Sequence, residues 1–145
     1  MLNSIINKIE ALILALTLFF VGLVYGDKPI EVEFDCELST YEISTDEFGR
    51  IHLDCVNVGR PFEGVEPFHA NFKFFKIENG KKVYVRYEGS ITVDSEPRAV
   101  LVKSGEEFGY NQIFLFPEGT EPGVYSLEVE VYGCEKIYED VLTIK

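Results

Sequence analysis

The sequence has no tryptophan, one methionine and only two histidines, and it is short of positive charge. Lys and Arg number 13 against 25 Asp and Glu, which gives a formal net charge of −12. Phosphate binding requires clustered basic side chains, so this imbalance argues against nucleic acid as a partner. No Ser or Cys lies in a known nucleophile motif, so we expect no catalytic residues and a protein that is not an enzyme.

One long hydrophobic run stands near the N-terminus, where residues 11–25 read ALILALTLFFVGLVY without a charge. Lys8 precedes the run and Gly26 follows it, a layout typical of a secretory signal peptide cut after Gly26. The competing interpretation is a retained anchor, because upstream apolar residues bring the run near the ~20 residues that span a bilayer. Either interpretation gives a signal peptide or membrane anchor over residues 1–26. The domain of residues 27–145 is then extracellular, or outside the cell on a membrane tether.

After Gly26 the sequence shows no sustained helical period and alternates instead. Residues 30–38 carry apolar side chains at even positions and acids at odd ones, which predicts a half-buried strand, and residues 51–56 repeat the pattern. Asn79-Gly80, between two alternating runs, predicts a type I′ hairpin turn. Further β-rich runs cover 86–93, 99–103, 109–116, 124–132 and 136–144. We therefore expect an all-β fold, an antiparallel β-sandwich of seven to nine strands, preceded by one apolar N-terminal helix.

Two segments carry a resemblance to a known family. LVKSGEEFGYNQIFLFPEGTEPGVYSLEVEVYG, residues 101–133, looks like the C-terminal half of extracytoplasmic immunoglobulin-like modules of the bacterial and archaeal adhesion-related and subtilisin-inhibitor-like types. IHLDCVNVGR, residues 51–60, resembles their second strand, which ends in Asn-x-Gly, here Asn57 and Gly59. The resemblance implies an immunoglobulin-like sandwich. The layout of an apolar helix before a sandwich is also similar to archaeal pilins and archaellum filament or stator proteins.

Three cysteines in an exported domain favour one disulfide. Cys36 and Cys55 both lie on the inward faces of predicted neighbouring strands, so we expect them to pair, and Cys55 with Cys134 is the alternative. Cys134 would then be a free thiol or form an intermolecular bond. There is no Cys-x-x-Cys pair, and His52 points to the opposite face from Cys55, so we expect no metal and no cofactor.

The segment RPFEGVEPF, residues 60–68, contains two prolines and a glycine and is expected to form a crossover loop. Phe62, Val65 and Phe68 are the candidate partner-binding residues of this loop, because loop aromatics at the end of a sandwich often bind proteins. The alternative is that these rings fold inward and cap the core. We expect exposure for Phe62 and capping for Phe68.

The function expected from these features is an extracellular or membrane-tethered interaction or structural module of the cell envelope. A protein is the expected partner, with a membrane involved only if the N-terminal helix is retained, and a homo-oligomer or filament is a further form of association. Two alternatives stay open. One is a protease inhibitor of the subtilisin-inhibitor-like type, and the other is an extracytoplasmic accessory subunit of a membrane or filament complex.

Overall fold

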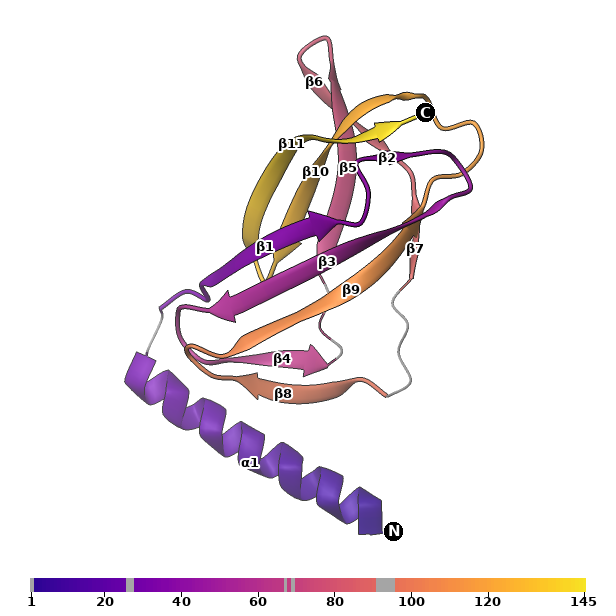
Figure 1. The fold of residues 1–145 in the computed structure, drawn as a ribbon. Coiled ribbons are helices and arrows are strands. Elements are labelled where there is room, and N and C mark those ends of the chain that lie inside the picture. Colours follow the sequence, from indigo (N-terminus) through magenta and orange to yellow (C-terminus); the bar gives the residue numbers. More distant parts are fainter. Residues whose placement is uncertain (1, 26–27, 67, 69, 91–95) are drawn as a thin grey trace.

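A computed structural model describes residues 2–25, 28–66, 68, 70–90 and 96–145 (Figure 1). One helix, α1 (Leu2–Tyr25), precedes a domain built of strands, which confirms the predicted all-β fold behind an apolar helix. The described residues form 11 strands, more than the expected seven to nine. The predicted cleavage point after Gly26 and the end of the predicted strand 86–93 lie outside the described residues.

Two β-sheets pack face to face. The first sheet, in spatial order, contains β1 (Val32–Leu38), β3 (Phe48–Asn57), β9 (Glu107–Leu115) and β7 (Glu88–Ser90). The second contains β2 (Glu42–Ile43), β11 (Cys134–Ile144), β10 (Gly123–Val131), β5 (Asn71–Glu78) and β6 (Lys81–Val85). All pairs are antiparallel except β2 with β11, which is parallel. A small two-stranded sheet of β4 (Phe62–Glu66) and β8 (Arg98–Val102) lies between the sandwich and α1 (Figure 1).

The core forms where the inward side chains of the two large sheets meet. Phe74 from β5 and Phe114 from β9 are fully buried, and their ring centroids lie 5.2 Å apart across the two layers. Phe116 packs against both rings. The alternation seen in residues 30–38 and 51–56 supplies the β1 and β3 part of this core, because every second side chain points inward.

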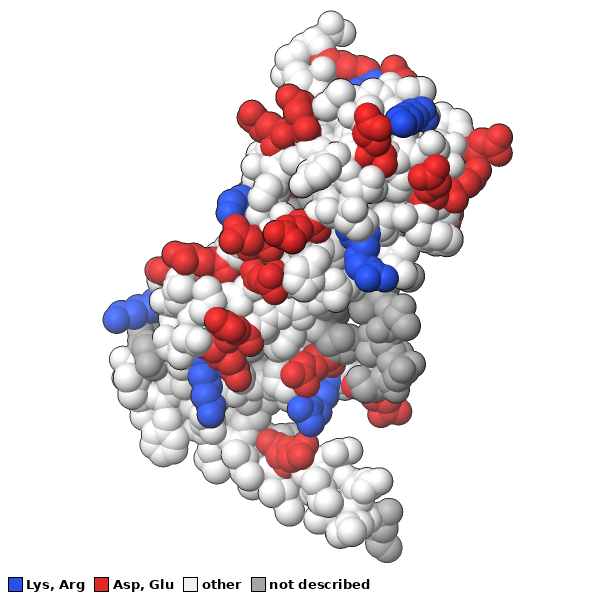
Figure 2. All heavy atoms as spheres, in the orientation of Figure 1, with Lys and Arg blue, Asp and Glu red and all other residues white. Residues whose placement is uncertain are grey.

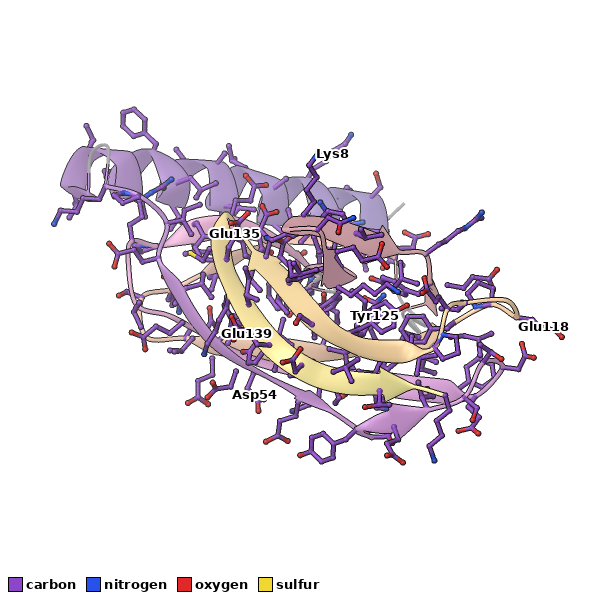
Figure 3. The ribbon with its side chains drawn as sticks, turned by 90° about the horizontal axis from the view of Figure 1, so that it is seen from above. Lys8, Asp54, Glu118, Tyr125, Glu135 and Glu139 are labelled. Atoms are coloured by element: carbon purple, nitrogen blue, oxygen red, sulfur yellow. The ribbon has the colours of Figure 1, made fainter. Side chains whose placement is uncertain are left out.

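The predicted hairpin turn is confirmed, and a tyrosine hydrogen bond fixes a second turn. Asn79 and Gly80 have φ values of 51° and 76°, the positive values of a two-residue type I′ turn between β5 and β6. Tyr125 is buried, and its hydroxyl donates a hydrogen bond of 2.6 Å to the carbonyl of Glu121, which fixes the chain where it enters β10. Glu118 stands at the tip of the loop before β10 (Figure 3).

The sandwich has one end near α1 and one end far from it. At the end near α1, β1 begins at Val32, opposite Asn57. The β8–β9 turn lies at the same end, where Gly105 N donates a hydrogen bond of 2.7 Å to the Asn57 carbonyl. β5 runs away from this end towards Asn79, so the β5–β6 turn lies at the opposite end (Figure 1). We call these the anchor end and the distal end.

Candidate functional site

The segment predicted as a loop, residues 60–68, is largely a strand. β4 covers Phe62–Glu66 and pairs with β8, so the prediction of a crossover loop is wrong. Pro61 lies just before the strand, where its missing N–H breaks no pairing. Gly64 lies where a Cβ would stand 2.9 Å from the Tyr132 hydroxyl, so its small size serves packing.

The three candidate binding residues of this segment have different surroundings. Phe62 is 2% exposed, and its ring centroid lies 4.6 Å from that of Tyr132, so the expectation of an exposed Phe62 is wrong. Phe68 is half-buried against Phe108, at 4.8 Å between ring centroids. Val65 points outward and is 41% exposed. The two aromatic rings therefore belong to the core, and only Val65 offers an exposed surface.

The expected Cys36–Cys55 disulfide is absent, and all three cysteines are free thiols. The register explains this. Cys36 lies opposite Leu53, and Cys55 lies opposite Phe34, so the two cysteines are diagonal and not directly paired. Burial raises the pKa of both thiols to about 12, and neighbouring acidic side chains, Glu37 and Asp54, add to the shift.

We expect Cys36 and Cys55 to react slowly with iodoacetamide at pH ~8, because the thiolate is the reactive form and a raised pKa makes it scarce. Alkylation of the native and the denatured chain, followed by peptide mass spectrometry, measures this difference. Both cysteines should become fully modified only after denaturation. A Cys36–Cys55 linked peptide from non-reduced protein would contradict the free thiols of this structure.

Side chains of β11 cover the outer edge of β1. Val32 N donates to the Cys134 sulfur at 3.4 Å, and Cys36 N donates to the Tyr138 hydroxyl at 3.1 Å. Between them, Lys136 Nζ donates to the carbonyl of Phe34 at 3.2 Å. These three side chains alternate along β11 and reach from one sheet to the other. We call this set the β11 clasp, and it leaves Cys134 half-buried against β1.

The outer face of the first sheet is acidic. Glu33, Asp35 and Glu37 of β1 point outward beside Asp54 of β3, and acidic side chains are spread over the visible surface (Figure 2). A groove of about 900 Å³ runs along β1, β3 and the start of β11. Within the described ranges, no group of three or more His, Cys, Asp or Glu side chains could hold a metal ion.

His52 lies on the same acidic face. Its Nδ1 is 2.7 Å from Asn111 Oδ1, and its Nε2 is 3.1 Å from Asp54 Oδ1. Both ring nitrogens thus face oxygen acceptors, which suits the doubly protonated ring. The hydrogen bond to Asn111 does most to raise the pKa of His52 above its usual value. The negative charge of Asp54 and its hydrogen bond to His52 raise this pKa further.

The distal end carries a different kind of surface at β6. This strand is the last of the second sheet, and among the described strands it pairs only with β5. Val83 and Tyr84 are 40% and 49% exposed. Lys82 lies over the ring of Phe75, at 4.9 Å from the centroid, and pairs with Glu128 at 2.9 Å. This open edge was not predicted from the sequence, because strand order depends on pairings between distant segments.

Comparison with known proteins gives similarity at the level of fold. No protein-family model and no curated protein sequence matches this chain. A β-glucosidase from Erythrobacter marinus matches with a TM-score of 0.50 and 15% identity, over 80% of this chain and 16% of the enzyme. A β-glucosidase from Listeria innocua matches with a TM-score of 0.44 and 13% identity, over 78% of this chain and 16% of the enzyme.

These similarities correct two predictions from the sequence. The resemblance to adhesion-related or subtilisin-inhibitor-like immunoglobulin-like modules is wrong, because the solved structure that matches with a TM-score of 0.50 is a β-glucosidase. The match to a β-glucosidase contradicts the expectation that the protein is not an enzyme, but at 15% identity it assigns no activity to this chain. At this identity the likeness shows the fold alone. The chain spans about one sixth of the enzymes' length, so it is similar to one part of them.

Proposed function

We propose that the protein is an extracytoplasmic accessory subunit of a membrane complex. In this proposal α1 anchors the chain in the membrane, the sandwich stands outside, and its distal end binds a protein partner. A sandwich similar in fold also occurs as one part of a larger protein, the β-glucosidase that matches with a TM-score of 0.50.

The observation that carries the proposal is the exposure of α1. Residues Leu2–Val21 form a helical stretch of 20 residues that is long and apolar enough to cross a membrane, and none of it is buried. The exposed side chains include Leu12, Phe19 and Leu23, each at 60% or more. Water disfavours such a surface, whereas the bilayer interior accepts it.

In this proposal the distal end is the part of the sandwich most accessible to a partner, because the anchor holds the other end near the membrane. The chain between Tyr25 and Val32 spans at most about 25 Å, so the anchor end of the sandwich stays close to the membrane. The β5–β6 turn and the loop before β10 lie at the far end (Figure 1). A partner that approaches from outside therefore meets the distal end first.

We expect the protein of the native host to remain in carbonate-washed membranes with an intact mass that includes the N-terminal helix. A retained anchor resists the alkaline wash because its apolar residues stay in the bilayer. A soluble chain that begins at Asp27 would overturn the anchored form and show a cleaved signal peptide.

A second measurement tests which side the sandwich faces. Glu118→Cys places an exposed thiol at a loop tip, and a membrane-impermeant maleimide should label it on intact cells. The unsubstituted chain, with its half-buried or buried cysteines, is the control. Labelling only after cell lysis would place the sandwich inside and overturn the proposal.

A further inference from the structure

We propose that the open edge of β6 binds an extended acidic segment of a partner protein, which adds to the second sheet as a further strand. The inference rests on the proposed function only in assigning the distal end to a protein partner. Strand addition of this kind uses backbone hydrogen bonds for affinity and side-chain contacts for selectivity.

The hydrogen-bonding pattern of the β5–β6 hairpin shows which backbone groups of β6 are free to pair with another strand. A two-residue turn at Asn79-Gly80 makes Glu78 and Lys81 a hydrogen-bonded pair, so Lys81, Val83 and Val85 direct their N–H and C=O groups towards β5. The N–H and C=O groups of Lys82 and Tyr84 then point to the open side. An added strand would pair with these groups.

The other sheet edges are less suited to a new strand. The edge of β1 is covered by the β11 clasp. β2 and β7 are two and three residues long, and β4 and β8 lie at the anchor end, which faces the membrane in the proposed function. Five residues of β6, in contrast, stand at the distal end with no described strand on their outer side.

The basic side chains near β6 indicate which kind of partner strand would bind there. Residues 79–87 contain Lys81, Lys82 and Arg86 and no acid, in a chain of net charge −12. Lys82 is paired with Glu128, whereas Lys81 and Arg86 form no salt bridge to any residue that the structure describes. Basic side chains on an edge oppose pairing with a like edge, which disfavours β6 of a second copy. Carboxylates on the incoming strand would instead be attracted to Lys81 and Arg86.

The experiment uses the full chain in detergent and a labelled acidic peptide. The probe has the sequence of residues 30–38, an alternating acidic segment, with Cys36 replaced by Ser; the matched neutral probe carries Gln and Asn in place of Glu and Asp. We expect fluorescence anisotropy to show saturable binding of the acidic probe. Binding of the neutral probe should be weaker, by about tenfold, and salt at about 0.5 M should weaken the acidic probe most.

Two pairs of variants locate the binding. Tyr84→Pro removes an outward N–H that Tyr84→Ala keeps, so the proline variant should lose binding that the alanine variant retains. Lys81→Gln combined with Arg86→Gln should weaken the acidic probe by about three- to tenfold. Lys103→Gln, an exposed lysine at the anchor end, is the control and should leave the affinity unchanged.

Four outcomes would overturn the inference. The acidic probe fails to bind at about 1 mM, the proline and alanine variants bind it equally, or the neutral probe binds as well as the acidic one. A dimer that Tyr84→Pro dissociates would show a second copy on β6 and would also overturn it. None of these results depends on the membrane form of the chain, which the intact mass tests separately.

Discussion

Replacing Phe62 with serine is expected to lower the free energy of unfolding by about 3 to 5 kcal/mol, the cost of truncating a buried aromatic side chain. The ring is 2% exposed and packs against Tyr132 and Phe108, so its removal leaves a cavity between β4 and the two sheets. A fall in the melting temperature of roughly 10 to 20 °C should follow. Circular dichroism is the suitable readout, since the chain has no tryptophan.

Val65→Ser is the matched control for this change. It lies on the same strand but points outward, so it should alter stability by no more than about 0.5 kcal/mol. Equal destabilisation by both variants would mean that β4 responds to any substitution. A Phe62→Ser variant as stable as the parent would contradict the buried position of the ring.

Replacing Asn57 with leucine should cost about 3 kcal/mol or more, because it leaves several buried backbone groups without hydrogen bonds. Asn57 is 0% exposed at the end of β3. Its Nδ2 donates to the carbonyls of Arg60 and Val102, at 2.9 and 3.2 Å, and its Oδ1 accepts from Gly59 N at 3.0 Å. One side chain thus joins β3, the entry to β4 and β8. Urea unfolding of the full chain followed by circular dichroism measures the loss.

Asn111→Leu is the control for the Asn57 variant. Asn111 lies on β9, is exposed, and contacts His52 on the surface, so this change should stay within about 0.5 kcal/mol of the parent. If the two leucine variants have the same stability, the hydrogen bonds of Asn57 do not hold the three segments together.

The sequence predicted the strands whose pairing is local and whose alternation is strong. β1 and β3 follow their period of two, and the Asn79-Gly80 turn fixes the β5–β6 hairpin without help from distant residues. β4 was missed because its partner, β8, lies more than 30 residues away and because prolines near both ends suggested a loop. Pairing with a distant strand outweighed the local turn composition.

The candidate site was harder to predict, because it depends on register and strand order. Cys36 and Cys55 are diagonal to each other in the observed β1–β3 register. A register shifted by two residues would place them directly opposite each other, as the sequence suggested. Alternation with a period of two places both cysteines inward in either register, so it cannot show which of the two registers forms. The open edge of β6 also follows from the order of strands in the whole sheet. The basic residues Lys81, Lys82 and Arg86 can be read from the sequence, but they do not show that β6 is an edge strand.

The β11 clasp has a mechanical consequence for a tethered protein. In the proposed anchored form, the chain from α1 enters the sandwich through β1, so tension between the membrane and the distal end would pull along this strand. β1 is hydrogen-bonded to β3 on one edge and to Cys134, Lys136 and Tyr138 on the other. A pull along its axis therefore loads both sets of bonds together, in shear, and does not peel them apart one at a time.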